Sequence, residues 1–337
     1  TGTVSVQALA LSTSIESSVL SVKPGAATAA AGYYIVNNPT SLNLSGNFKD
    51  IDLTGFTGNL TNNGRTIYGN LILASGMTLS AGTGTTTFAG TTGTKTITSN
   101  GETMDFPVTF NGAGSTWQLI DNLTVGSTRL TTLTNGTVDL NGQTFSTGTF
   151  ATATGTKNLT FNAGTLQITG SGATAFNNAQ PTNFTTTAGT GTGKISLNSA
   201  SAKTFVGGGS TYNCTLEQAG TGALTITGSN TFTTISNSVQ PTTITFTAGT
   251  TQTVTNFTVS GTSGNLVTLN STTTSQFTLS DTTGIITVNY CDISYSNATG
   301  GAEWRAPTAN YNGYGNINSG NNTGWLFNIS KQFMMFF

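Results

Sequence analysis

Two pairs of acidic residues are the parts of this chain whose types and spacing could support chemistry. Asp50 and Asp52 stand two residues apart, so on a strand both would face one side, at the separation that glycosidases need between their carboxyl groups. Glu102 and Asp105 lie in an expected turn, where they could bind a cation together with main-chain carbonyls. We favour the simpler interpretation that both pairs are surface residues. Around Asp50 the sequence offers only Lys49 and two phenylalanines, whereas an enzymatic groove needs further Arg, Tyr and Trp.

A third acidic group lies near the C-terminus, where Asp292 and Glu303 accompany Arg305. These residues could form a structural salt bridge or a cation site, but their spacing matches no known metal-binding loop. The chain has no His, which excludes Ser-His and Cys-His nucleophiles and His-ligated metals. The glycine triplet at 207–209 falls between strands and predicts a turn instead of a phosphate-binding loop. We therefore expect no enzymatic activity, no cofactor and no metal site.

The composition indicates an all-β protein. Thr accounts for 74 of the 337 residues, and only 6% of the residues are charged. Thr favours strands, while Asn and the 43 glycines favour turns. The net charge of −1 is too small to hold a nucleic-acid backbone, and no apolar run is long enough to span a membrane as a helix. An almost uncharged surface suits a subunit of a permanent assembly or an extracellular protein.

Short segments of alternating apolar and polar residues recur along the chain, with turn residues between them. Residues 163–190 resemble residues 219–250, and their Gln-Pro pairs place Pro181 and Pro241 sixty residues apart. Such self-similarity is typical of stacked repeats, in which Asn and Thr side chains form ladders. We predict a right-handed parallel β-helix of about ten or more turns, with tandem β-sandwiches as the alternative. The expected strands lie at 42–44, 51–53, 71–73, 138–140, 159–161, 166–168, 195–197, 224–226, 244–246, 257–259, 277–279, 288–290 and 291–293.

The two ends of the chain differ from the repetitive middle, which we place at residues 37–294. Residues 1–36 include a stretch of small residues and predict an arm that attaches the protein to a larger particle. Residues 295–337 lose the alternation, and their aromatic side chains are expected to cap the open end of the solenoid and to join subunits. The expected cap and assembly residues are Trp304, Trp325, Phe327, Phe333, Met334, Met335, Phe336 and Phe337.

Cys214 and Cys291 are the two cysteines of the chain. Their separation in sequence corresponds to three or four turns of a solenoid, which is roughly 14–19 Å along the axis. A disulfide requires Cα atoms within about 7 Å of each other. The solenoid therefore predicts two free thiols, and we expect both to be buried and unreactive.

Three stretches of the sequence resemble one family of β-helical proteins. They are ITGSNTFTTISNSVQPTTITFTAGTTQTVTNFTVSGTSGNLVTLNS (226–271), CDISYSNATGGAEWRA (291–306) and NSGNNTGWLF (318–327). The family occurs in bacteriophage and marine metagenomic sequences, where its members are described as virion structural or tail-fibre-like proteins. The resemblance covers about residues 195–327 and implies a structural or adhesive role, with no catalytic residues to carry over. By analogy with phage fibres it also implies a homo-oligomer, with a trimer favoured, and a host surface glycan as a candidate partner.

Three functions are compatible with the sequence. We favour a non-enzymatic structural protein of an extracellular assembly: a phage virion fibre, spike or decoration subunit that is located in the virion and used for attachment. The first alternative is a bacterial secreted adhesin or surface-filament subunit, because similar repeats occur in bacterial surface proteins. The second alternative is a polysaccharide-degrading β-helix enzyme, which a reducing-sugar assay would distinguish from the other two.

Overall fold

A computed structural model of the chain describes residues 3–8, 19–21, 32–33, 40–308 and 313–328. The chain forms an all-β parallel solenoid of about 13 turns, with no helix in its described part. The predicted solenoid is therefore confirmed and the alternative of tandem β-sandwiches is wrong, whereas the hand of the winding stays a prediction. The chain divides into two compact units, Thr1–Ser196 and Leu197–Phe337.

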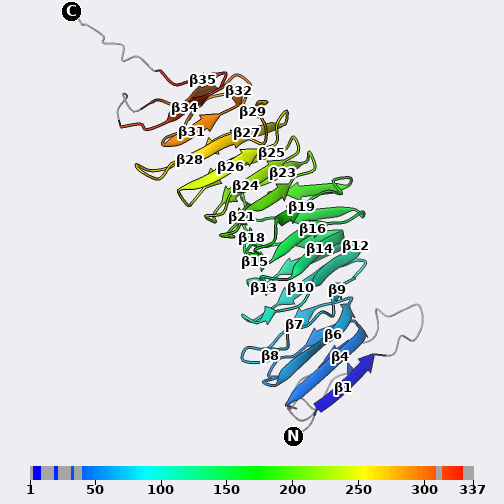
Figure 1. The fold of residues 1–337 in the computed structure, drawn as a ribbon. Helices are drawn as coiled ribbons and strands as arrows, with labels where there is room; N and C mark the ends of the chain where they lie inside the picture. Colours follow the sequence, from blue (N-terminus) through cyan, green and yellow to red (C-terminus); the bar gives the residue numbers. More distant parts are fainter. Residues whose placement is uncertain (1–2, 9–18, 22–31, 34–39, 309–312, 329–337) are drawn as a thin grey trace, which may run out of the picture. The chain divides into compact units, whose positions relative to one another are not determined.

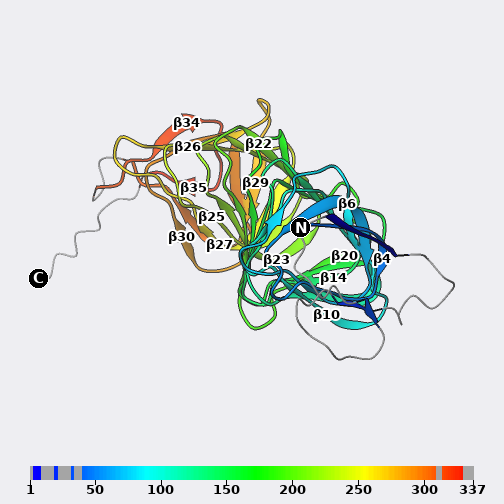
Figure 2. The ribbon, with the colours of Figure 1, turned by 90° about the horizontal axis from the view of Figure 1, so that it is seen from below.

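The first unit is built from two sheets whose strands wind round a common interior (Figures 1 and 2). Strands of successive turns pair in parallel, for example Leu42 with Leu60 and Val138 with Leu159. The first sheet contains β1 (Thr3–Ala8), β2 (Val19–Ser21), β3 (Gly32–Tyr33), β4 (Ser41–Phe48), β5 (Ile51–Asp52), β6 (Asn59–Ile67), β7 (Leu71–Ile72), β8 (Thr78–Leu79), β9 (Thr86–Phe88), β10 (Gly93–Thr98), β12 (Val108–Leu119), β14 (Leu130–Asp139), β16 (Thr149–Thr152), β17 (Lys157–Thr160), β19 (Thr174–Asn177) and β20 (Phe184–Thr187). The second sheet contains β11 (Thr103–Met104), β13 (Leu123–Val125), β15 (Thr144–Thr147) and β18 (Thr165–Ile168), and β21 (Lys194–Leu197) contains the residue at which the unit ends.

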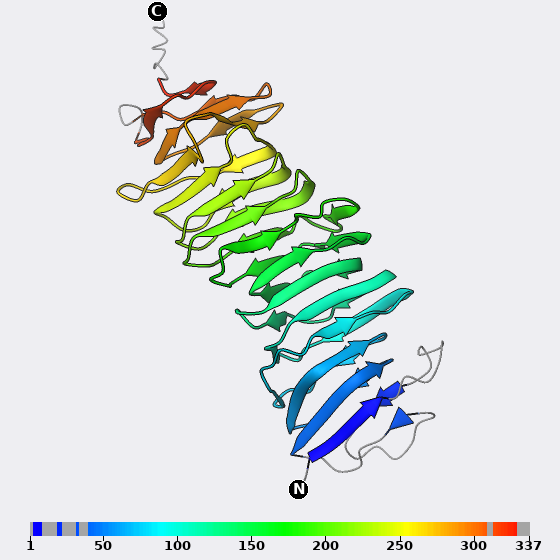
Figure 3. The ribbon, with the colours of Figure 1, turned by 45° about the vertical axis from the view of Figure 1, so that its right-hand side comes forward.

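The second unit also consists of parallel strands of successive turns (Figure 3). It contains a third, three-stranded sheet. Its first sheet contains β22 (Lys203–Val206), β24 (Leu224–Thr227), β26 (Thr242–Phe246), β28 (Val267–Ser271), β31 (Cys291–Ser294) and β34 (Ile317–Gly320). Its second sheet contains β23 (Thr211–Gln218), β25 (Thr231–Asn237), β27 (Thr251–Thr258), β29 (Phe277–Ser280) and β32 (Ser296–Thr299). The third sheet contains β30 (Ile285–Thr287), β33 (Glu303–Arg305) and β35 (Trp325–Leu326).

An apolar column fills part of the interior of the first unit. Phe48, Ile67, Phe88, Phe110 and Leu133 pair one after another on β4, β6, β9, β12 and β14, and all five side chains are buried. The rings of Phe88 and Phe110 stack with their centroids 5.1 Å apart. Burying a large apolar side chain contributes roughly 1.5–3 kcal/mol, so each member of the column helps to fix one turn on the next.

A lysine is the first member of one column of paired residues in the second unit. The column consists of Lys203, Leu224, Ile244, Leu269 and Ile293, which pair on β22, β24, β26, β28 and β31. Lys203 is only 3% exposed, and its Nζ donates to the carbonyls of Ser199 and Gly222 at 2.9 and 2.7 Å. Because burial disfavours the charged form, the pKa of Lys203 falls to about 8. Lys157 of the first unit is likewise buried and bonded to carbonyls.

Polar side chains form ladders between successive turns. The Asn135 amide donates to the Asn111 amide oxygen at 2.7 Å, on paired residues of β14 and β12. The Thr152 hydroxyl donates to the amide oxygen of Asn178 at 2.7 Å. These contacts confirm the expected Asn and Thr ladders. They satisfy polar groups without any charge, which explains how a chain with so few charged residues can form a regular surface.

Most of the expected strands coincide with strands of the structure, but residues 288–290 do not. These residues form the bend before β31, where Tyr290 has a φ of 52°. The strand in this part of the chain is β30, three residues earlier. The prediction is wrong here because alternation alone does not reveal a backbone in the left-handed region. The glycine triplet is the expected turn, with Gly208 and Gly209 at φ values of 66° and 75°.

The weak alternation of residues 4–22 predicts one or two strands, and β1 and β2 match it, whereas β3 and the strands after residue 295 go beyond the sequence pattern. Within the expected arm, β1 pairs with β4, and β2 pairs with β3 and β5. After residue 295 the described residues form β32 to β35, and each of these strands has only two to four residues. Strands this short leave little room for alternation. The attachment role of the arm stays a prediction, and the expected assembly residues 333–337 lie outside the described residues.

Candidate functional site

The acidic residues singled out in the sequence do not form one site. Asp50 precedes β5 and accepts the Asn70 N–H at 2.6 Å, whereas Asp52 lies in β5 and accepts the Thr54 N–H at 3.0 Å. Asp50 and Asp52 are both half-buried while Ile51 and Leu53 are buried, as expected for two acids on one outer face, but each carboxylate has its own main-chain partner. Each carboxylate binds the main chain of a turn, which is a structural role.

Glu102 and Asp105 also have separate partners. Glu102 accepts the N–H of Gly76 at 3.0 Å, and Asp105 accepts the Nε–H of Arg129 at 2.7 Å. The Arg129 guanidinium holds the pKa of Asp105 below its usual range. The two acids therefore stabilise different contacts between turns and do not meet as a pair of cation ligands.

The C-terminal group separates in the same way. Glu303 and Arg305 form the expected salt bridge, with 2.6 Å between Oε1 and Nε, and this contact holds the pKa of Glu303 below its usual range. Asp292 instead accepts a hydrogen bond from the hydroxyl of Ser319. Across the described residues, no three Cys, Asp or Glu side chains gather as a set of metal ligands.

The prediction of two free, buried cysteines is confirmed. Neither Cys214 nor Cys291 forms a disulfide, and both are fully buried. Burial raises the pKa of the Cys291 thiol to about 12. A thiol with so high a pKa is almost entirely protonated at neutral pH, so it is a poor nucleophile.

An open pocket of about 380 Å³ lies between β27 and β30 in the second unit. We call it the slot and define it by the residues that line it: Asn256, Phe257, Thr258, Ser260, Ile285, Ile286 and Thr287. None of these residues is ionisable. The slot therefore offers hydroxyl, amide and main-chain groups next to apolar side chains, which suits binding better than acid–base chemistry.

The slot exists because one turn of the solenoid is built differently from the turns before it. β23, β25 and β27 are each seven or eight residues long, and β27 pairs with β25 along most of its length. On its other edge, β27 pairs with β29 only from Thr251 to Thr253. The chain then turns at residues 281–284 and resumes as β30, which pairs with β33 and forms no ladder with β27. The second half of β27 therefore faces a strand with which it does not pair.

Both ends of the slot are closed by contacts between the same two turns. At one end Thr253 pairs with Ser280. At the other end the Ser260 hydroxyl accepts the Asn289 N–H at 3.2 Å, and the Gly261 N–H donates to the Asn289 carbonyl at 2.9 Å. The slot is thus a bounded opening between two neighbouring turns and does not extend further along the strands.

Main-chain groups of β30 line one side of the slot. The Gly284 carbonyl accepts the Glu303 N–H at 2.9 Å, and the Val288 N–H donates to the Arg305 carbonyl at 3.0 Å. The main-chain N–H and C=O groups of successive residues alternate in direction along a strand. Those of Ile286, which lies between Gly284 and Val288, therefore also point towards β33. Ile285 and Thr287 must therefore direct their N–H and C=O groups towards the slot.

One main-chain unit of β27 faces the slot from the opposite side. The Val259 carbonyl accepts a contact from the Cys291 thiol at 3.7 Å, which shows that it points towards the later turn. Because main-chain direction alternates along a strand, the N–H and C=O groups of Phe257, two residues earlier, point the same way. Donors and acceptors of two strand edges thus face one another across the opening.

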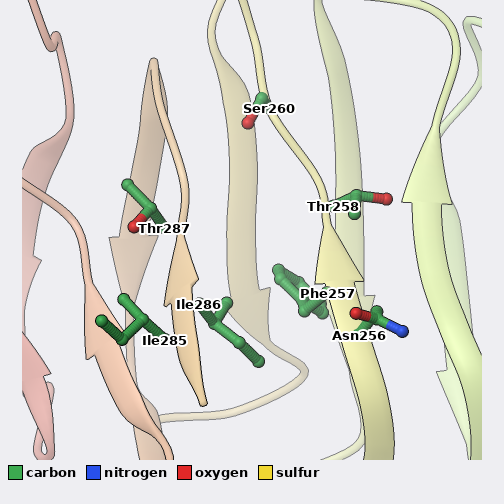
Figure 4. A pocket seen from close by; sticks show the side chains of 7 residues that line it. All are labelled: Asn256, Phe257, Thr258, Ser260, Ile285, Ile286 and Thr287. Carbon is green, nitrogen blue, oxygen red and sulfur yellow. The ribbon is translucent and has the colours of Figure 1, made fainter.

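Two buried apolar side chains form the floor of the slot. Phe257 and Ile286 point towards one another from β27 and β30 (Figure 4). They are 3% and 7% exposed, respectively. Behind them, the Trp304 ring lies 5.9 Å from the ring of Phe257 and 5.2 Å from that of Trp325. The floor is therefore packed on a pair of tryptophans.

The structure places three of the expected cap and assembly residues in the last turns. Trp304, Trp325 and Phe327 are 1%, 8% and 9% exposed. The Trp304 indole N–H donates to the Thr299 carbonyl at 3.0 Å. In this chain the two tryptophans support the slot from inside, and their role in joining subunits stays a prediction.

The residues that line the slot do not stand out as a site in the sequence. Ile285 and Thr287 lie in a strand that the sequence pattern does not predict. The available signal was Gly284-Ile285-Ile286, two adjacent apolar residues directly after a glycine turn. One isoleucine of such a pair must be exposed on a strand, and Ile285 is 58% exposed.

Comparisons of the chain with protein-family models, curated proteins and solved structures find no match. The fold alone therefore defines the class of this protein, a parallel β-solenoid, and that class serves structural and enzymatic roles. In the described part of the chain, no helix is long and apolar enough to cross a membrane.

Proposed function

We propose that this chain is a non-enzymatic structural and attachment subunit of an extracellular assembly, with a phage virion fibre, spike or decoration protein as the favoured placement. The observation that carries the proposal is that the acidic side chains are engaged in structural hydrogen bonds and do not face one groove together. Asp50, Asp52, Glu102 and Asp105 each bind a main-chain N–H or an arginine, and the slot contains no ionisable side chain. A glycosidase needs two carboxyl groups facing one groove.

Two further features support a structural role. The stacked apolar columns and the uncharged Asn and Thr ladders fix each turn on its neighbours, as a solenoid requires. The resemblance of residues 195–327 to virion structural proteins favours the phage placement over a bacterial adhesin or surface filament.

The test of placement is imaging of the intact assembly. Cryo-electron microscopy, with an antibody against this chain as a label, should locate it on a capsid or a tail. Finding the chain on a cell-surface filament would support the adhesin alternative instead. Release of reducing sugar from a host polysaccharide, lost in the double variant D50N/D52N, would support the enzyme alternative and contradict the proposal.

The assembly state is a separate part of the proposal and rests on the apolar sequence of residues 333–337. A variant lacking residues 331–337 should dissociate or become insoluble, and its β-sheet circular dichroism should be unchanged. The control is K331A/Q332A, which retains the apolar residues and should remain a trimer by light scattering. A truncated variant with the mass and solubility of the intact protein would contradict this part.

A further inference from the structure

We propose that the slot between β27 and β30 binds an uncharged saccharide unit of a surface glycan. The inference rests on the attachment role proposed above and assigns it to one site. It starts from the interrupted ladder: Phe257 on one edge, and Ile285 and Thr287 on the other, direct main-chain groups into an open pocket of about 380 Å³. That volume is within the range of small-molecule sites.

The polar groups of the slot suit vicinal hydroxyls. Each main-chain unit offers one donor and one acceptor, and a sugar hydroxyl both donates and accepts. In the free protein water solvates these groups, and a saccharide replaces that water without leaving a buried polar group unpaired. The Thr258 and Thr287 hydroxyls and the Asn256 amide flank the opening and are exposed.

The apolar groups of the slot suit the C–H face of a sugar ring. The floor is made by Phe257 and Ile286, and Ile285 beside it is 58% exposed. Trp304 packs behind Phe257, so the floor is already formed before a ligand binds. Preformed apolar contact next to fixed hydrogen-bonding groups reduces the entropic cost of binding.

The electrostatics of the slot exclude an anionic ligand. No residue that lines it is charged. On the adjoining β33, Glu303 and Arg305 pair with Ile285 and Thr287 in the ladder, but they form a salt bridge with each other. An acidic sugar or a phosphate would lose its hydration in the slot without gaining a cation.

The closed floor disfavours an extended peptide as the occupant. A strand that completes the ladder would direct alternate side chains to both faces of the sheet. On the inner face, Phe257 and Ile286 already fill the space and are almost fully buried. A flat saccharide ring requires no such inward volume.

The test measures binding of neutral and acidic glycans to the full chain. An array of neutral and sialylated or sulfated oligosaccharides identifies the probe, and isothermal titration with the best neutral oligosaccharide measures its affinity. We expect binding of neutral probes only, with an I285E variant at least tenfold weaker. The matched control is I317E, which changes an isoleucine of similar exposure on β34, and it should bind within twofold of the unmodified chain.

A second variant tests the main-chain contribution. T287P removes the N–H that faces the slot while leaving the bonds of β30 to β33, because an edge strand tolerates proline on its unpaired side. It should also weaken binding at least tenfold, with circular dichroism unchanged. Binding only of acidic glycans, binding of an extended peptide in place of sugar, equal affinity of I285E and I317E, or no glycan binding at all would each overturn the inference. The imaging of the assembly is independent of all these outcomes, so the proposed structural role can hold if the glycan site fails.

Discussion

The two edges of β27 show how one solenoid produces both a continuous wall and an opening. On the side of β25, β27 pairs through Asn256, Phe257 and Thr258, and the columns of side chains continue from turn to turn. On the side of β30, the same three residues have no ladder partner, and the slot lies there. The strand is the same in both cases, so the difference comes from the turn at 281–284 in the following coil. A solenoid can thus acquire a binding surface by changing a turn, while its core residues remain.

The largest expected difference between the two regions is in core energetics. Tyr212 on β23 is fully buried, its ring stacks on Phe232 at 5.1 Å, and its hydroxyl donates to the Gly207 carbonyl at 2.8 Å. Y212A should lower the free energy of unfolding by about 3–5 kcal/mol. I285A on β30 should change it by about 0.5 kcal/mol or less, because Ile285 is largely exposed. Urea unfolding measures both values, and equal losses would contradict the comparison.

A smaller effect concerns Lys203, which lies in the unbroken column of β22, β24, β26, β28 and β31 in the first sheet. The pKa of Lys203 is about 8 in the folded chain, against an ordinary value of 10.5. Between pH 8 and 10.5 the unfolded chain binds more protons than the folded chain, so the free energy of unfolding rises with pH. Below pH 8 Lys203 is charged in both states, and the full cost of burying that charge lowers the stability of the folded chain. The melting temperature should increase by a few degrees, about 2–5 °C, between pH 8 and 9.5.

The control for this titration is K203M, which keeps the length of the side chain but has no ionisable group. The melting temperature of K203M should lack the rise of about 2–5 °C between pH 8 and 9.5 that is attributed to Lys203. A slope that persists in K203M would assign the effect to another group.

Amide hydrogen exchange should distinguish the two edges residue by residue. The amides of Ile285 and Thr287 face the slot, whereas the Val288 amide donates to the Arg305 carbonyl. Ile285 and Thr287 should therefore exchange about tenfold faster than Val288, since no strand in the described part of the chain pairs with them on that side. Similar protection of all three amides would mean that β27 and β30 pair in solution.

The smallest expected effect is in thiol reactivity. Cys214 lies in β23 within the continuous wall, and Cys291 contacts the Val259 carbonyl near the end of the slot. Both are buried, so both should react with a disulfide reagent far more slowly than a free thiol. Cys291 should nevertheless react before Cys214, because opening of the slot exposes it. The order is measured by mass spectrometry of the modified peptides. If Cys214 reacted first, the prediction that the solenoid opens more readily at the slot than at β23 would be wrong.

The sequence was sufficient to predict the solenoid but not the opening in it. Alternating triplets such as 224–226 and 244–246 mark strands locally, and the sixty-residue repeat indicates stacking, so both are visible without coordinates. The slot depends on which strands fail to pair across a turn, and Thr253 and Ser280 are 27 residues apart. The spacing of Asp50 and Asp52 predicts that both lie on the outer face, but it does not reveal that each carboxylate accepts a main-chain N–H of a turn.

The uncharged ladders have a consequence for the surroundings in which this protein can work. Salt weakens attraction between exposed charges, and the distance over which they act falls from about 10 Å at 0.1 M to about 3 Å at 1 M ionic strength. A bond such as that between Asn135 and Asn111 carries no charge for the ions to screen. A solenoid held together in this way should remain intact whether it is transferred to dilute water or to brine.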